Sequence, residues 1–330
     1  MRRYFRHSAY TLIAVVCLML VLSPTAGAQT YTLSTLPDQK VYNDFVVGPG
    51  KTELILNPGE SRTVIISIAN RLGTEKTFSL SEEDTEGSND PNQPIVLLGD
   101  DRGPYSLKDV LSIATTSVDI PHAEKAFVPV TISIPADAQP GGLYGSVLVS
   151  VKANADASPA DSANTTDSNP VITRLATLFF VRVAGNADES GRLADFSLSG
   201  GHSIMFDEQP LDFNLVFKND GNVHLVPHGT ITVSNIFNSP IANIDVDPWF
   251  AMPQSLRFRQ ISWMPPFLFG RYTARAYISR GYASTSDQAN IVFWVIPWKI
   301  IAGIVVGLTL VVFVIRWFVS RVHISFGRKA

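Results

Sequence analysis

The stretch FVPVTISIPADAQPGGLYGSVLVSV, residues 127–151, decides the fold of this chain. Its first eight residues place an apolar side chain at every second position, which is typical of a strand with one buried face. Its last nine residues form a second apolar run, long enough for a central strand. Pro140-Gly141-Gly142, between the two runs, is a turn signal. The stretch therefore predicts two consecutive strands of an antiparallel sandwich.

The same pattern continues on both sides of this stretch. Residues 63–69 (TVIISIA) and 175–183 (LATLFFVRV) are rich in β-branched and aromatic side chains, and turn clusters occur at 57–60 and 219–222. Strands at intervals of about 10–12 residues with such turns predict an all-β fold of immunoglobulin-like antiparallel β-sandwiches. Only residues 106–113 (SLKDVLSI) predict a short helix, which Ser106 would cap.

A change of composition at residues 184–192 (AGNADESGR) predicts a boundary between two domains. We expect a first β-sandwich over 29–185 and a second over 190–296. Residues 153–170 have the composition of a linker. A domain break there would separate the strand at 175–183 from its sandwich, so we expect a mobile loop inside the first domain.

One feature is shared by the two predicted domains. A strand ends at Asn70 in the first and at Asn219 in the second, each just before a turn. This similarity indicates a duplication.

Residues 1–28 predict a secretory signal peptide. A basic start precedes an apolar stretch at 11–22, and Ala26-Gly27-Ala28 is a small-residue cleavage site. Cys17, the one cysteine of the chain, lies inside this segment. A disulfide scaffold and a thiolate metal cluster are therefore excluded.

A second apolar segment predicts a transmembrane helix over 298–319. Basic residues flank its uncharged part on both sides, and tryptophans lie where an aromatic belt is expected. The residues predicted at the membrane interface are Trp294, Trp298, Lys299, Arg316, Trp317 and Arg321. The tail 320–330 is basic and has no acidic residue, which predicts a cytoplasmic C-terminus. We therefore expect a single-pass type I protein of the plasma membrane with an extracellular ectodomain.

The charge of the predicted ectodomain differs from that of the whole chain. The chain has a formal net charge of −3, with 17% charged residues. Residues 29–298 hold 18 basic and 29 acidic side chains, a net charge of −11. An acidic surface of this kind argues against nucleic acid as a partner.

Three segments together resemble a known family. They are LILNPGESRTVIISIAN, SLKDVLSI and VPVTISIPADAQPGGLYGSVLVSV, in this order. The chain over about 43–185 resembles the first domain of the WxL-interacting bacterial cell-surface proteins. The resemblance implies a peptidoglycan-binding first domain, followed by a second sandwich and one C-terminal span with a basic tail. The second domain is similar to that family only in class and position, and the resemblance implies no catalytic residue.

The sequence offers little for catalysis, metal or cofactor binding. The predicted ectodomain contains none of the motifs G-x-S-x-G, H-E-x-x-H or G-x-G-x-x-G, and no P-loop. His224 and His228 are four residues apart, but Pro227 disfavours a helix, so we interpret them as loop or strand histidines. The acidic run at 82–90 is interpreted as a solvated loop and not as a calcium site. We expect no catalytic residue, cofactor or metal.

Two apolar loops are the more informative feature. If strands alternate in direction up to the predicted span, Trp249 and Phe250 lie at the end of the second sandwich that faces the first domain. Phe267, Leu268 and Phe269 then lie at the membrane-proximal end. We expect an interdomain contact for the first pair and a shallow membrane contact for the other three. The alternative in both cases is that these side chains close the sandwich core.

These observations predict a membrane-anchored surface protein with a non-catalytic binding or adhesion function. Its expected partners are the lipid bilayer and peptidoglycan or another surface protein, without nucleic acid. One alternative is a chaperone-like or scaffold protein for the assembly of surface structures. A second alternative is an enzyme with an unrecognised carboxylate site.

Overall fold

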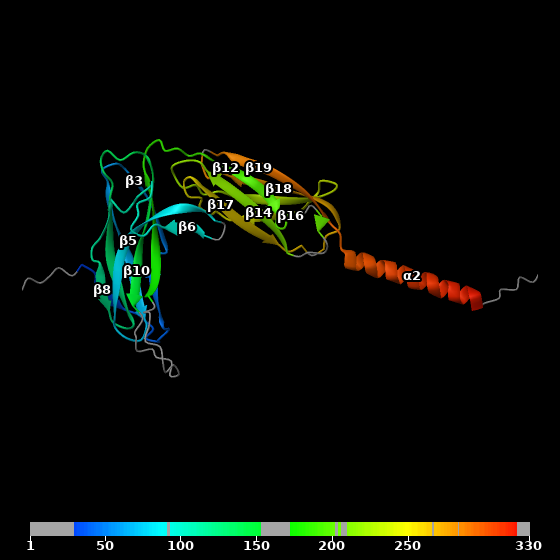
Figure 1. The fold of residues 1–330 in the computed structure, drawn as a ribbon, viewed down its shortest axis with the longest axis horizontal. Helices are drawn as coiled ribbons and strands as arrows, with labels where there is room; N and C mark the ends of the chain where they lie inside the picture. Colours follow the sequence, from blue (N-terminus) through cyan, green and yellow to red (C-terminus); the bar gives the residue numbers. More distant parts are fainter. Residues whose placement is uncertain are drawn as a thin grey trace, which may run out of the picture.

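The computed structural model describes residues 30–90, 93–152, 172–201, 204–205, 210–265, 267–282 and 284–321. In these ranges the chain forms two β-sandwiches and one long helix that leaves the second of them (Figure 1). The predicted fold class, two immunoglobulin-like sandwiches followed by an apolar helix, is confirmed. The predicted signal peptide 1–28, the loop 153–170 and the tail beyond Arg321 lie outside the described residues.

The first sandwich consists of two sheets. The five-stranded sheet has the order β1 (Thr32–Thr35), β9 (Glu124–Ser133), β4 (Ser61–Arg71) and β2 (Asp44–Gly48), and β7 (Leu111–Ile113) also pairs with β9. The six-stranded sheet has the order β3 (Lys51–Leu56), β11 (Ile172–Val183), β10 (Gly141–Lys152), β5 (Lys76–Asp90) and β6 (Gln93–Leu97), and β8 (Ser117–Ile120) also pairs with β5.

The stretch 127–151 contributes to both sheets. Val128, Val130 and Ile132 point from β9 into the core, and Val147 and Val149 enter the same core from β10. Burial of a side chain of this size is worth roughly 1.5–3 kcal/mol, so the alternation fixes which face of each strand is inside. Along its whole length β10 pairs with β11 in antiparallel register. The strands on both sides of residues 153–170 therefore belong to one sheet.

The helix predicted at residues 106–113 does not form. The Asp84 carboxylate is fully buried and accepts the N–H groups of Leu107 and Lys108 at 3.0 and 2.9 Å. These bonds hold a turn, after which β7 pairs with the edge of β9. Asp84 itself lies in β5, so the acidic run 82–90 is part of a strand and the predicted loop is wrong. Tertiary pairing has overridden local helix propensity here.

The second sandwich also has two sheets. The three-stranded sheet has the order β12 (Gly191–Leu198), β14 (Leu211–Asn219) and β17 (Ser255–Trp263). The other has the order β13 (Ile204–Met205), β19 (Ser286–Val295), β18 (Gly270–Ser279), β15 (His228–Asn235) and β16 (Pro240–Val246). In β14 every second residue is buried, from Leu211 to Asn219, and these side chains form the centre of the second core.

Asn70 and Asn219 occupy equivalent places in the two sandwiches. Each is fully buried, and each side chain accepts the N–H of the residue two positions later, Leu72 or Gly221. Each side-chain amide also donates to the carbonyl four residues later and to a carbonyl from a distant segment. The shared bonding pattern gives the similarity found in the sequence a structural basis.

The helix α2 (Trp298–Arg321) begins where predicted and ends two residues later than predicted. Its 24 residues span about 36 Å at 1.5 Å per residue, which exceeds the roughly 30 Å hydrocarbon core of a bilayer. None of them is buried against the rest of the described chain. This helix is therefore long and apolar enough to cross a membrane.

Candidate functional site: the groove between the two domains

An aromatic cluster joins the two sandwiches. Tyr144 of β10 and Phe180 of β11 lie opposite each other on the outer face of their sheet, yet both are fully buried. Phe250 and Met252 of the second domain cover them. The rings of Phe180 and Phe250 meet edge to face, with centroids 5.3 Å apart. Such a covered cluster on the outer face of a sheet holds two domains in one arrangement.

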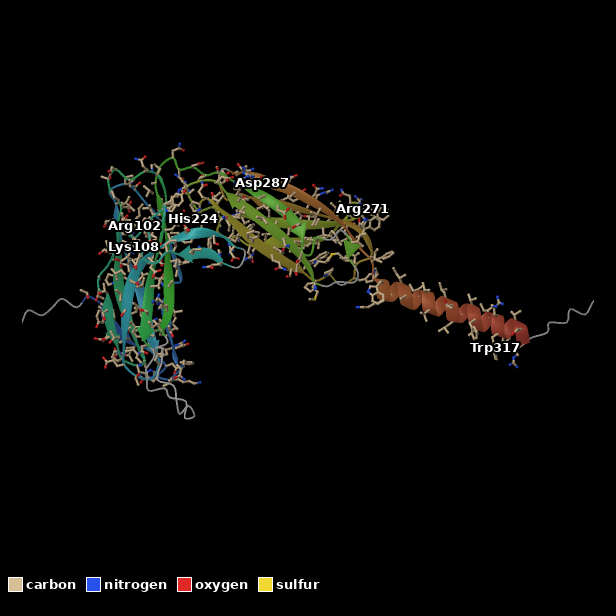
Figure 2. The ribbon with its side chains drawn as sticks, viewed as in Figure 1. Arg102, Lys108, His224, Arg271, Asp287 and Trp317 are labelled. Carbon is tan, nitrogen blue, oxygen red and sulfur yellow. The ribbon has the colours of Figure 1, made fainter. Side chains whose placement is uncertain are left out.

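A pair of polar contacts lies at the centre of this cluster. The backbone N–H of His224, labelled in Figure 2, donates to the Tyr144 hydroxyl at 2.5 Å, and that hydroxyl lies 3.1 Å from Nδ1 of the His224 ring. Burial raises the pKa of Tyr144 and lowers the pKa of His224. Both side chains are therefore neutral at physiological pH, and Nδ1 of the neutral ring can accept a hydrogen bond from the hydroxyl in the tautomer with the proton on Nε2.

Hydrogen bonds on two sides of the cluster add further contacts between the domains. The carbonyl of Asn222 accepts the N–H of Gly142 at 2.9 Å, and its side-chain amide donates to the Pro140 carbonyl at 3.2 Å. The β5–β6 hairpin reaches across to the edge strand β17 (Figure 1), where Asn89 Oδ1 accepts the N–H of Leu256 at 2.9 Å. Among the described residues, the aromatic cluster, Asn222 and the β5–β6 hairpin thus each link the two domains.

Gly87 of the same hairpin allows this close approach. A Cβ atom at Gly87 would lie 2.6 Å from the Cβ atoms of Met252 and Ser255 in the second domain. Contacts this short are not tolerated between carbon atoms, so β5 can approach β17 only because residue 87 has no side chain.

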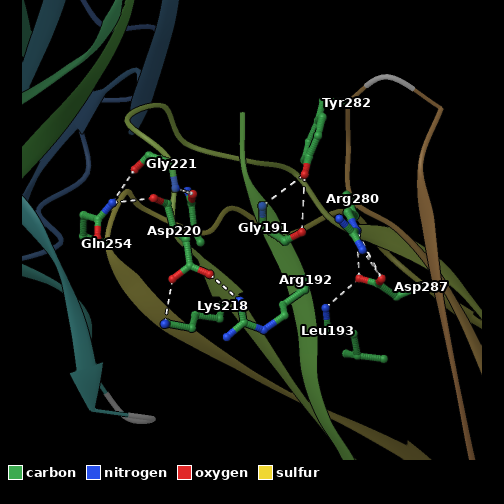
Figure 3. Close-up of polar contacts among 11 residues, drawn as sticks. Gly191, Arg192, Leu193, Lys218, Asp220, Gly221, Gln254, Arg280, Tyr282 and Asp287 are labelled. Carbon is green, nitrogen blue, oxygen red and sulfur yellow. Dashed lines mark hydrogen bonds and ion pairs between the residues drawn. The ribbon is translucent and has the colours of Figure 1, made fainter. Parts of the chain in front are cut away.

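The connection between the domains is held by the contacts drawn in Figure 3. The Asp287 carboxylate forms an ion pair with Arg280 at 2.5 Å and accepts the N–H of Leu193 at 2.7 Å. The Tyr282 hydroxyl accepts the N–H of Gly191 at 3.1 Å. Gly191 and Leu193 lie in β12, the first strand after the connection. These bonds therefore fix the point at which the chain enters the second domain.

Beside the cluster lies a groove of about 350 Å³ between the two domains. Its walls are β3 and β11 on one side, and residues 224–226 with Gly281 on the other. Among the strands that the structure describes, β11 alone pairs with β3, so the other edge of β3 is open. Ile55 of β3 lies in the groove wall and is 72% exposed.

Half of the backbone groups of β3 point toward this open edge. The carbonyls of Gly50 and Leu56 accept hydrogen bonds from the β11 side. In a parallel pair, alternate residues bond to the same neighbour. The N–H and C=O groups of Lys51, Glu53 and Ile55 consequently point away from β11. They form a row of donors and acceptors that another extended strand can use.

The charged side chains at the groove form ion pairs with one another. Lys51 pairs with Glu53 and Arg182 with Glu189, both at 2.5 Å. The Lys51 ammonium also lies 5.5 Å from the centroid of the Phe180 ring. Partly exposed pairs of this kind contribute little to stability, and a charged ligand can replace one of the partners. The groove thus combines backbone hydrogen bonding, an exposed aliphatic side chain and exchangeable charges.

In the part of the chain that the structure describes, no group of three or more His, Cys, Asp or Glu side chains is placed to hold a metal ion. His224 belongs to the domain interface, and the ring of His228 contacts the Val226 carbonyl at 3.1 Å. Glu53 and Glu189, the two acidic residues of the groove, each have a basic partner. This arrangement is suited to binding and gives no support to an acid–base pair.

Trp249 and Phe250, predicted at the interdomain contact, have different environments. Phe250 packs on the first domain through Phe180. Trp249 instead belongs to the core of the second sandwich, where its ring meets Phe217 edge to face. The prediction is corrected for Trp249, because successive residues in extended backbone point to opposite sides.

The three residues of the predicted membrane contact also have different environments. Phe267 and Phe269 are exposed at 57% and 62%, whereas Leu268 is 5% exposed and packs in the second core. Leu268 is therefore removed from the predicted membrane contact, since its side chain closes the sandwich. The residues predicted at the membrane interface, Trp294, Trp298, Lys299, Arg316, Trp317 and Arg321, lie on the outer surface of β19 and α2. Arg321 lies over the Trp317 ring at 5.8 Å.

Comparison with known proteins gives no family for the chain. No family model and no curated protein matches it. Among solved structures, it is similar to the class 5 fimbriae chaperone CfaA, with 11% identity, 77% of this chain and 100% of that one covered, and a TM-score of 0.36. The YadV chaperone matches at 8% identity, 76% and 100% coverage and a TM-score of 0.35. Likenesses at this level carry no argument about function.

Tyr144 and Phe180 were not among the contact residues predicted from the sequence. A usable signal was present, because Phe179-Phe180 and Leu143-Tyr144 place large side chains on both faces of paired strands. A strand that is apolar on both faces is covered on both faces. The role of Asn222 had no comparable signal, since its contacts with Pro140 and Gly142 are about 80 residues away along the chain.

Proposed function

We propose that this chain is a membrane-anchored, non-catalytic binding module of the cell surface. Its partner is an extended segment of another surface protein, which adds as a strand to β3 in the interdomain groove. The observation that carries this proposal is the open edge of β3, with the exposed Ile55 beside it. Strand addition gains affinity from main-chain hydrogen bonds and specificity from side-chain contacts.

The proposal is closest to the chaperone-like or scaffold interpretation of the sequence. Two domains joined by an aromatic interface, with an open strand edge beside that interface, can hold a partner segment without catalysing a reaction. Cell-wall attachment by the first domain, which the family resemblance implies, is a second candidate. Its support is the sequence likeness over 43–185, whereas the groove supports a protein partner.

The proposed orientation places both sandwiches outside the cell and the C-terminus in the cytoplasm. It is supported by the cations at and beyond Arg316 and by the acidic character of residues 29–298. Membrane-impermeant maleimide should label Ile65→Cys on intact or wall-stripped cells and should not label Ser325→Cys. Labelling of the Ser325→Cys variant alone would reverse the orientation.

A photo-crosslinking amino acid in place of Ile55, in the native host, tests the groove directly. We expect a protein adduct that is absent when the same amino acid replaces Ile65, an exposed residue on the opposite sheet of the first domain. An adduct with peptidoglycan fragments at position 55 would favour the second candidate. The absence of any adduct specific to position 55 would contradict the proposal.

A matched pair of substitutions tests whether the backbone edge is the contact. Glu53→Pro removes an N–H that points to the open edge and breaks the Lys51 ion pair, whereas Glu53→Ala breaks the ion pair only. We expect the adduct at position 55 to be lost with proline and kept with alanine. Equal yields from the two variants would show that strand addition is not the binding mode.

A further inference from the structure

Two loops and the start of α2 meet at one end of the second sandwich. The pairing of Gly270 with Val295 places the β17–β18 loop beside the end of β19. The pairing of Asn235 with Tyr272 places the β15–β16 turn at the same end. Only Ile296 and Pro297 separate β19 from α2, which leaves from this end in Figure 1.

The tips of both loops carry exposed apolar side chains. In the β15–β16 turn, Phe237 is 87% exposed and Ile236 is also exposed. In the β17–β18 loop, Met264 is 72% exposed and accompanies Phe267 and Phe269. Five exposed large apolar side chains at one end of a domain are typical of a contact surface. We call these five residues the apolar end.

Both loops are held in this conformation by specific contacts. Asn235 Oδ1 accepts the N–H groups of Phe237 and Ser239, each at 3.0 Å. The Tyr272 hydroxyl contacts both the N–H and the carbonyl of Phe269 at 3.1 Å. These bonds hold the backbone at Phe237 and at Phe269 in place.

Aromatic and basic side chains accompany the apolar end. Trp294 and Trp298 are exposed, and Arg271 pairs with Trp294 across β18 and β19 (Figure 2 labels Arg271 at this end). Lys299 follows in the first turn of α2. Tryptophan and cationic side chains around an apolar centre match the composition of a membrane interface.

We propose that the apolar end rests in the headgroup region of the bilayer that α2 crosses. The occupant follows from continuity with the helix. Three Cα–Cα steps of 3.8 Å connect Val295 to Trp298, so the end of the sandwich lies within about 11 Å of the start of the span. A surface held that close to lipid meets the bilayer before it meets a second copy of the chain.

This contact would set the orientation of the ectodomain relative to the membrane. The inference rests on the membrane anchor of the proposed function and adds to it how the groove is oriented. A single helix lets a domain tilt freely. Two loops that enter the interface on the same side as α2 would hold the second sandwich upright. The groove would then be presented at a fixed distance from the membrane, about one sandwich length away.

Lipid nitroxide quenching in nanodiscs tests this inference with the full chain. Environment-sensitive fluorophores are attached to single cysteines in the variants Phe237→Cys and Phe269→Cys. Cys17 is replaced by serine if the predicted signal peptide, residues 1–28, is still attached. Ile65→Cys in the first domain is the exposed control, and Val311→Cys in α2 reports on the span. The two quenchers are phospholipids with a nitroxide close to the headgroup or close to the bilayer centre.

We expect the headgroup-proximal nitroxide to quench the labels at 237 and 269 by about threefold more than the label at 65, because interfacial side chains lie about 5–10 Å into the headgroup boundary. The label at 311 should respond to the central nitroxide. If the central nitroxide quenches the label at 311, while the labels at 237 and 269 are quenched no more than the label at 65, the membrane anchor is supported and this inference fails. If 311 does not respond, the anchor in the proposed function fails as well. Shielding of 237 and 269 only in discs that hold two chains would make this end a self-interface and would also overturn the inference.

Discussion

The two ends of the second sandwich both carry apolar loops, but different surroundings cover them. At the end that faces the first domain, Phe250 and Met252 are covered by Tyr144 and Phe180. At the other end, the side chains of Phe237, Phe267 and Phe269 project away from the protein. The sequences of the two sets of loops are similar in composition, so composition alone does not show what covers a loop. The neighbouring part of the chain does, because one end adjoins the first domain and the other adjoins α2, a helix long and apolar enough to cross a membrane.

Within each loop, the comparison separates neighbouring residues. Trp249 and Leu268 close the core at their respective ends, and Phe250 and Phe267 point outward beside them. The two interpretations weighed for each loop, core closure and external contact, therefore both apply, to different residues.

The largest expected effect comes from the β17–β18 loop, at the end of the second sandwich that adjoins α2. Leu268→Ala should destabilise the full chain by about 3 kcal/mol, because a buried leucine is lost and a cavity remains. Phe267→Ala, its exposed neighbour, should change the free energy of unfolding by less than about 0.5 kcal/mol. Chemical denaturation followed by tryptophan fluorescence measures both. Equal losses would remove the distinction between core and contact residues in this loop.

The next largest effect is expected at the domain interface. Gly87→Ala would place a methyl group 2.6 Å from Met252 and Ser255, and overpacking of this kind costs about 1–3 kcal/mol. We expect the domains to move apart, which distance measurements between spin labels on the two domains would detect. Gly50→Ala, where a Cβ meets nothing within 4 Å, is the matched control. An unchanged distance distribution in Gly87→Ala would show that the interface does not depend on this approach.

Tyr144→Phe should cost about 1–2 kcal/mol, because the buried N–H of His224 loses its acceptor. The loss should appear as weaker coupling between the domains, with one calorimetric transition broadening or dividing into two. Tyr277→Phe, at an exposed position in β18, should leave the profile unchanged. A Tyr144→Phe profile identical to that of the parent chain would argue against the polar contact.

The smallest effect is a dependence of stability on pH. Burial lowers the pKa of His224 in the folded chain below its ordinary value of 6.5. The unfolded chain therefore takes up a proton before the folded chain does as the pH falls. Stability should be unaffected above the unfolded pKa and should decline as the pH falls from about 7 toward the folded pKa. His224→Phe should remove this part of the slope, and an unchanged slope would assign it to other groups.

Much of the fold could be predicted because it depends on residues that are close together in the sequence. The alternation in residues 127–134, the apolar run of α2 and the turns after Asn70 and Asn219 each depend on neighbouring residues. The segment 106–113 could not be predicted in the same way, because the buried Asp84 and the edge of β9 determine its conformation from a distance.

The candidate site was less predictable for the same reason. Phe250 was found from strand direction, which is a local argument extended over several strands. Its partners Tyr144 and Phe180 lie 106 and 70 positions away in the sequence, and the contact between Tyr144 and His224 joins residues 80 positions apart. Ile236 and Phe237 follow directly after β15, and in the sequence they read as a continuation of that strand.

Methionine oxidation of the full chain in nanodiscs tests most directly whether different partners cover the two ends. Met252 is 1% exposed in the folded chain and Met264 is 72% exposed, one at each end of the second sandwich. Ile65→Met supplies a solvent-exposed reference in the first domain. We expect Met252 and Met264 both to oxidise at least about tenfold more slowly than the reference methionine, since susceptibility follows exposure. Oxidation of Met264 as fast as the reference would show that the bilayer does not cover this end and would contradict the proposed membrane contact.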